Sequence, residues 1–118
     1  MNVTRSRLAV AALAAVLAAP VFAGTQARAE DAHVFNITIK DHKFDPAEVR
    51  IPAGKPVILV VKNDDPTAEE FESSALKVEK IIAGGQQGTI RLRPLAAGTY
   101  SFVGEFHKDT AKGTVIAE

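Results

Sequence analysis

Side chains that could bind a metal ion gather in three short segments of this chain. The candidate ligands are His42, Glu70, Glu72, Glu105 and His107. Imidazole and carboxylate groups suit Cu(II), Fe(II), Fe(III), Mn(II) and Zn(II), and copper stands first in the divalent affinity order. The sequence has no Cys, and Met1 is its only Met, so soft sulfur ligands are excluded from any such site.

Each candidate also has a plainer interpretation. Glu70 and Glu72 lie on one side of a strand by the period of two, whereas Glu69 points with Phe71. If Phe71 faces the core, the Glu70 and Glu72 pair faces outward, where a charged surface stripe is common. Like charges two residues apart repel, however, unless a cation partners them. The two histidines could equally be solvated loop residues, and both interpretations stay open at this point.

The first 29 residues are predicted to be a secretory signal peptide. Arg5 and Arg7 precede an apolar run over 8–17, and small residues follow Pro20. The run is too short to span a membrane, which takes about 20 residues. Cleavage is expected after Ala29 or Ala23, which leaves residues 30–118 as a single exported domain.

The charge of the remaining chain argues against nucleic acid as a partner. All 14 acidic residues follow the predicted signal peptide, whereas three arginines lie within it. Residues 30–118 are therefore mildly acidic, which makes this domain a poor nucleic-acid binder. Other enzyme chemistry finds little support, because there is no recognisable nucleophile motif or phosphate-binding loop. A glycosidase cleft would need aromatic side chains, and the chain has no Trp and one Tyr.

Alternation of apolar and polar residues predicts short strands throughout residues 30–118. Phe35, Ile37 and Ile39 share one face of the first, whose other face is polar. Strands are expected near 35–40, 48–51, 57–62, 70–73, 78–82, 89–93, 100–103 and 113–117. With about seven to eight short strands and no helical period, an all-β sandwich is predicted.

The order of these signals resembles the cupredoxin family from Phe35 to Ala117. The resemblance is carried by Phe44-x-Pro46, Val49-x-Ile51-Pro-Ala-Gly54 and Leu95-x-x-Gly98-Thr-Tyr100-x-Phe102. It implies a cupredoxin-like Greek-key β-sandwich. Tyr100, Phe102 and His107 match the copper-binding end of the family, but Gly104 stands where the Cys ligand should be. A type 1 blue copper site is therefore not expected.

A narrower likeness is to cupredoxin-like periplasmic components of bacterial ferrous-iron uptake systems, which work beside an inner-membrane iron permease. The segments Glu70-Phe71-Glu72 and Gly104-Glu105-Phe106-His107 carry it. This likeness implies a periplasmic protein that binds copper or iron. The cupredoxin resemblance places the metal at one end of the sandwich, so it implies that the segments 41–43, 69–72 and 105–107 meet there. Anionic oxygen ligands favour Fe(III) over Fe(II), so a ferroxidase activity is one expectation. The alternative is a metal-free β-sandwich adaptor or ligand-binding subunit of a membrane transport complex.

Overall fold

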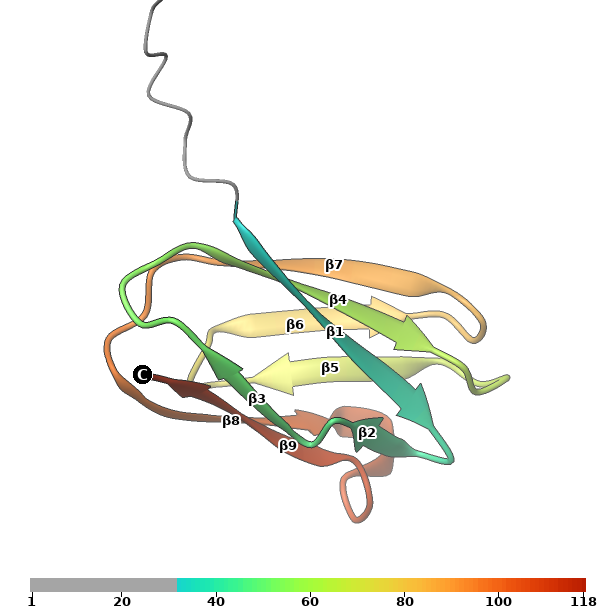
Figure 1. The fold of residues 1–118 in the computed structure, drawn as a ribbon. Coiled ribbons are helices and arrows are strands. Elements are labelled where there is room, and N and C mark those ends of the chain that lie inside the picture. Colours follow the sequence, from blue (N-terminus) through green and yellow to red (C-terminus); the bar gives the residue numbers. More distant parts are fainter. Residues whose placement is uncertain (1–31) are drawn as a thin grey trace, which may run out of the picture.

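The computed structural model describes residues 32–118 as a β-sandwich (Figure 1). The predicted signal peptide, residues 1–29, lies outside the described residues. Two sheets pack face to face, with strand orders β2-β1-β4-β7 and β3-β9-β8-β5-β6. The strands are β1 His33–Lys40, β2 Lys43–Asp45, β3 Glu48–Ile51, β4 Val57–Asn63, β5 Glu69–Ser73, β6 Val78–Ile82, β7 Gln87–Leu92, β8 Gly98–Gly104 and β9 Lys112–Ala117, and the 3₁₀ helix η1 is Glu105–His107.

The all-β prediction is confirmed, with nine strands among the described residues instead of seven or eight. The additional strand is β2, which contains Phe44 and pairs antiparallel with the end of β1. Its three residues are too few for an alternating pattern to reveal. No helix in residues 32–118 is long and apolar enough to cross a membrane.

The core fills the space between the two sheets. Strand β4 alternates buried residues with partly or fully exposed ones. It pairs parallel with β1 and antiparallel with β7, and so lies inside its sheet. The large apolar side chains that are at most 1% exposed come from both sheets: Ile37, Ile39, Val57, Leu59, Val61, Phe71, Phe102 and Val115. Burying each such apolar side chain contributes about 1.5–3 kcal/mol.

Three phenylalanines join the sheets close to the end where the histidines lie. The Phe71 and Phe102 rings stack with centroids 4.7 Å apart, and the Phe44 ring meets Phe102 edge-on at 4.9 Å. Phe71 is two residues from Glu69, and its strand register places it opposite Gly104. This packed aromatic layer gives the loops at that end a rigid base.

Candidate metal centre

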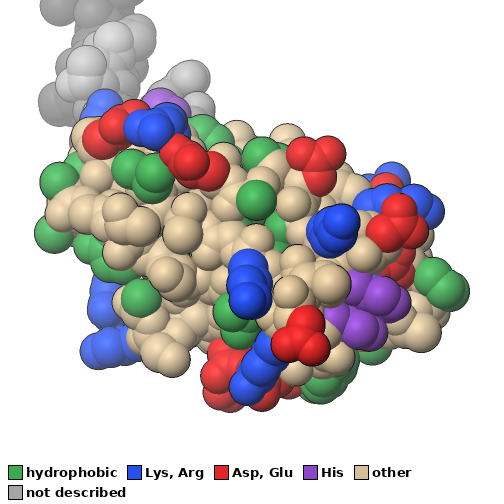
Figure 2. All heavy atoms as spheres, turned by 90° about the horizontal axis from the view of Figure 1, so that it is seen from below, with side chains coloured by type: hydrophobic (Ala, Val, Ile, Leu, Met, Phe, Trp, Pro, Cys, Tyr) green, Lys and Arg blue, Asp and Glu red, His purple; other side chains and the backbone are tan. Residues whose placement is uncertain are grey.

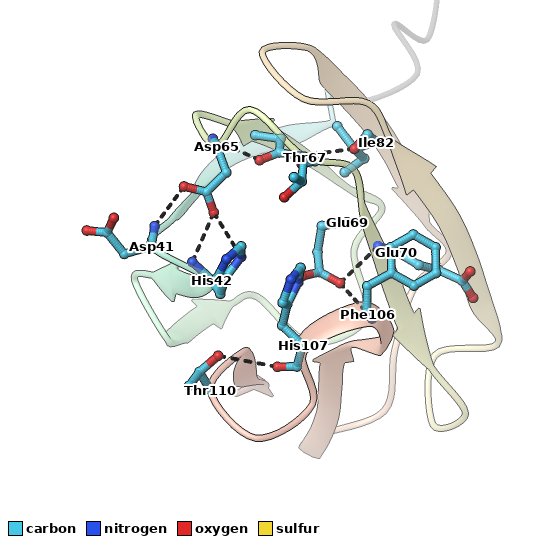
Figure 3. A network of polar contacts seen from close by, with 11 residues as sticks. Asp41, His42, Asp65, Thr67, Glu69, Glu70, Ile82, Phe106, His107 and Thr110 are labelled. Atoms are coloured by element: carbon cyan, nitrogen blue, oxygen red, sulfur yellow. Dashed lines mark hydrogen bonds and ion pairs between the residues drawn. The ribbon is translucent and has the colours of Figure 1, made fainter.

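Three separate segments meet at one end of the sandwich (Figure 3). His42 lies in the turn between β1 and β2, Glu69 begins β5, and His107 ends the 3₁₀ helix that follows β8. One potential ligand atom from each of these residues lies within 4.8 Å of the other two. We call this group the His42–Glu69–His107 cluster.

Glu69 is the buried member of the cluster, with only 1% of its surface exposed. Its Oε1 accepts hydrogen bonds from the backbone N–H groups of Glu70 at 3.1 Å and Phe106 at 2.9 Å. Its Oε2 lies 2.5 Å from Nδ1 of His107. A buried carboxylate is costly without partners, and here both of its oxygens have them. The second oxygen faces the histidines, where a bound cation would complete its charge pairing.

Gly104 makes room for this carboxylate. A Cβ atom at position 104 would lie 2.7 Å from Cδ of Glu69 and 2.6 Å from Cβ of Ala111. Both separations are shorter than van der Waals contact, so a side chain here and the present position of Glu69 exclude each other. Position 104 is a glycine and so has no thiol for a blue copper site. The Glu69 side chain occupies the space that a side chain at position 104 would fill.

His107 is held by the loop that follows it. Its carbonyl oxygen accepts hydrogen bonds from the backbone N–H groups of Thr110 at 3.2 Å and Ala111 at 2.8 Å. The N–H of Gly104 in turn donates to the carbonyl of Ala111 at 2.9 Å. These bonds close a short loop that fixes the His107 ring beside Glu69.

The two histidine rings lie against each other. Their centroids are 3.6 Å apart, and their planes differ by 13°. The lone pairs of parallel rings do not converge, so binding of one ion by both rings requires the planes to tilt apart. The side chains of His42 and His107 are 43% and 29% exposed, which leaves the cluster open to an ion from solvent.

The space-filling view shows histidine side chains as a surface patch at one end of the domain, bordered by charged groups (Figure 2). A depression of ≈ 490 Å³ beside the rings is lined by His42, Phe106, His107 and Asp109, among others. It gives solvent ions a direct route to the cluster.

The structure places the other predicted ligands outside this cluster. Strand β5 alternates as expected: Glu69 and Phe71 are buried, whereas Glu70 and Glu72 are partly exposed on the opposite face. The Glu70 carboxylate points away from the histidines (Figure 3). Glu69 is therefore the functional candidate that the sequence-based ligand set did not include. The available signal was its inward direction with Phe71, because an inward carboxylate at a strand end needs a partner.

Glu72 and Glu105 form a second, separate group with Lys108. The hydrogen bond with Glu105 raises the pKa of Glu72, and the same bond, together with Lys108, lowers the pKa of Glu105. Nζ of Lys108 lies 2.9 Å from Oε1 of Glu105. The Glu72 and Glu105 carboxylates thus interact with each other and with Lys108, outside the His42–Glu69–His107 cluster.

The chain belongs to the cupredoxin-like domain family, which matches residues 10–117. It is 48% identical over 80 residues to an uncharacterized protein of Rickettsia prowazekii (strain Madrid E). That match covers 68% of this chain and 64% of the relative, so less than two thirds of the relative's length is matched.

Solved structures share the fold. One is the metal-binding domain of the Cu(I)-exporting P-type ATPase of Streptococcus pneumoniae D39, with a TM-score of 0.65 and 17% identity over 72% of this chain and 84% of that one. Another is auracyanin A, a "blue" copper protein from Chloroflexus aurantiacus, with a TM-score of 0.64 and 16% identity. That match covers 75% of this chain and 100% of the auracyanin chain. A third is amicyanin from Paracoccus versutus, with a TM-score of 0.56 and 21% identity over 75% of this chain and 83% of the amicyanin chain. The predicted cupredoxin-like fold is thereby confirmed.

The residues present do not fit a type 1 blue copper centre, because the sequence has no thiolate to offer. They do fit a non-blue site of nitrogen and oxygen ligands. The fit rests on a buried carboxylate, Glu69, whose second oxygen points at two imidazoles.

Proposed function

We propose that this protein binds a copper or iron ion at the His42–Glu69–His107 cluster and assists ferrous-iron uptake. It does so in the periplasm, by binding or oxidising Fe(II) before the iron passes to an inner-membrane permease. The observation that carries the proposal is the meeting of one buried carboxylate with two imidazoles, all within 4.8 Å.

The ligand set supports iron and copper for different reasons. Two histidines and one carboxylate are the protein ligands of many non-haem Fe(II) sites, which keep further positions open. Cu(II) has the highest affinity of the divalent ions for such nitrogen and oxygen donors. The cupredoxin-like relatives named above include copper proteins, which adds support for copper. Bound copper would supply one-electron chemistry, and the three residues would hold it.

Oxidation of iron follows from the charge of Glu69. An anionic oxygen ligand stabilises Fe(III) more than Fe(II), which lowers the reduction potential and makes Fe(II) easier to oxidise. Each Fe(II) loses one electron, and in aerobic solution dioxygen accepts the electrons together with protons and forms water. Glu69 is buried, so solvent and salt screen its charge less than they screen a surface carboxylate.

Location and partner rest on the sequence. The predicted signal peptide over residues 1–29 supports export to the periplasm. The partly exposed carboxylates of Glu70, Glu72 and Glu105 lie on neighbouring elements and would raise the local concentration of cations. A membrane permease that accepts iron would dock near this end of the domain.

Isothermal titration of the mature protein with Cu(II), and anaerobically with Fe(II), tests the proposal. Replacing the ligand in His107→Ala should weaken binding at least tenfold, about 1.4 kcal/mol. His33→Ala is the matched control, because His33 begins β1 and lies outside the cluster. The Cu(II) form should lack the intense blue colour of a copper–thiolate bond. If the wild-type protein bound neither ion, the metal-free adaptor would be the better account.

A further inference from the structure

We propose that Asp65 is the positioning residue of the cluster: its carboxylate holds the Asp41–His42 turn so that the His42 ring lies against His107. The inference rests on the proposed function, because it concerns His42 as a ligand. Asp65 itself offers no atom to the cluster.

The turn that carries His42 has an uncommon backbone. Asp41 and His42 join Lys40 to Lys43, the last pair of the β1–β2 ladder, and have φ angles of 51° and 57°. A two-residue hairpin turn of type I′ needs positive φ at both positions, and Gly is preferred at the second. His42 therefore occupies a position where Gly is preferred, and contacts from its surroundings offset the cost of placing a side chain there.

Asp65 supplies that support from 23 residues away. Its Oδ1 accepts a hydrogen bond from the Asp41 N–H at 2.8 Å, and its Oδ2 accepts one from the His42 N–H at 2.9 Å. One carboxylate thus binds both backbone amides of the turn (Figure 3).

The same carboxylate faces the His42 ring. Nδ1 of His42 lies 3.5 Å from Oδ2 of Asp65. A carboxylate beside Nδ1 favours the tautomer with the proton on that nitrogen, which leaves the Nε2 lone pair for an ion. Carboxylates that orient metal-binding histidines in this way commonly change metal affinity 10- to 100-fold when they are replaced.

Asp65 is rigid enough for this role. It is 6% exposed, its N–H donates to Oδ1 of Asn63 at 3.0 Å, and its carbonyl accepts from the Gly85 N–H at 3.1 Å. The Asn63 amide donates in turn to the carbonyls of Thr67 and Ile82. These bonds fix the loop after β4 against β6. The Asp65 side chain is the part of this loop that contacts the His42 turn.

A metal-free measurement tests the positioning directly. In NMR spectra of the wild-type protein, ring protons of His42 should be shifted upfield by the stacked His107 ring. Asp65→Asn, which keeps the shape but can accept only one of the two bonds, should abolish that shift and raise amide exchange at Asp41 and His42 at least tenfold. Asp64→Asn is the matched control, because Asp64 is exposed and pairs with Lys62 at 3.4 Å. Asp65→Glu, which keeps the charge but moves the carboxylate, gives the same test should Asp65→Asn not fold.

Titration with Cu(II) then tests the link to the site. Asp65→Asn should weaken Cu(II) binding about tenfold or more in the wild-type background. It should have little further effect in His42→Ala, because the ring it positions is already gone. Pulsed electron paramagnetic resonance should count one imidazole fewer on Cu(II) in Asp65→Asn, which general destabilisation would not cause.

The outcomes separate the two proposals. Equal losses of affinity in both backgrounds, or an unchanged His42 ring shift in Asp65→Asn and Asp65→Glu, would overturn the role of Asp65. A wild-type protein that binds no ion would overturn the proposed function, while the metal-free spectra still decide whether Asp65 positions His42.

Discussion

The Glu69 carboxylate lies in the space that a side chain at position 104 would need, and Gly104 provides it. A Cβ atom on Gly104 would stand 2.7 Å from Cδ of Glu69. Cupredoxins with a blue site place a Cys at this position, as the resemblance in the sequence implies. In this chain a glycine stands in place of the Cys, and the buried Glu69 side chain fills the space that the Cys side chain would occupy.

Gly104→Ala should therefore destabilise the protein and disturb the cluster together. The new methyl group overlaps Glu69 and Ala111, and overpacking of this kind costs about 1–3 kcal/mol. Urea unfolding measures the loss, and Cu(II) titration measures the effect on binding. Removing the Ala111 methyl group should relieve part of this overlap. Gly104→Ala should therefore cost less stability in an Ala111→Gly protein than in the wild type. Wild-type stability and affinity in Gly104→Ala would contradict the packing described for Glu69.

Much of the scaffold could be predicted from the sequence, because its strands alternate clearly. Strands β3 and β6 have the expected bounds, and the direction of Glu69 with Phe71 follows from the period of two. The partners of Glu69 could not be predicted, since His107 is 38 residues away and meets it only through the packing of β5 and η1. A ligand set based on local spacing therefore favoured Glu70 and Glu72.

The turn at His42 escaped prediction for a different reason. The sequence signal for a type I′ hairpin turn is strong where Gly follows Asn, Asp or Gly, and His42 stands where that Gly would be. The conformation is held by Asp65, a residue of another loop. Local propensity cannot reveal a turn that a distant carboxylate stabilises.

Asp65 should make the stability depend on acidity. Hydrogen bonds from the His42 and Asp41 amides lower its pKa in the folded state. Its contribution is thus fully present above the unfolded pKa, about 3.9 for Asp, and is lost as the pH falls through the lower folded value. Urea unfolding from about pH 6 to about pH 3 should show a shallower acid-side loss in Asp65→Asn than in the wild type. The Asp64→Asn control should keep the wild-type slope, and identical slopes in all three proteins would remove this role.

Aerobic Fe(II) oxidation should depend on Glu69 more than on the outer carboxylates. Glu69→Gln keeps the shape and removes the charge that favours Fe(III), so the rate should fall about tenfold or more, equivalent to about 1.4 kcal/mol. The Glu70→Gln, Glu72→Gln double variant should slow oxidation less, because both carboxylates lie outside the cluster. A colorimetric assay of remaining Fe(II) against a buffer control measures the rates. If Glu69→Gln still bound iron and oxidised it at the wild-type rate, Glu69 would not set the iron potential.

Titration of Glu69→Gln and Glu70→Gln with Cu(II) tests metal binding at the cluster most directly. The two variants carry the same substitution on adjacent residues, one facing His107 and the other facing away. The Glu70 backbone N–H that donates to Glu69 is unaffected by its side chain. We expect Glu69→Gln to bind Cu(II) at least tenfold more weakly than the wild type, about 1.4 kcal/mol, and Glu70→Gln to bind like the wild type. Wild-type affinity in Glu69→Gln, or a larger loss in Glu70→Gln, would contradict the assignment of the His42–Glu69–His107 cluster as the metal centre.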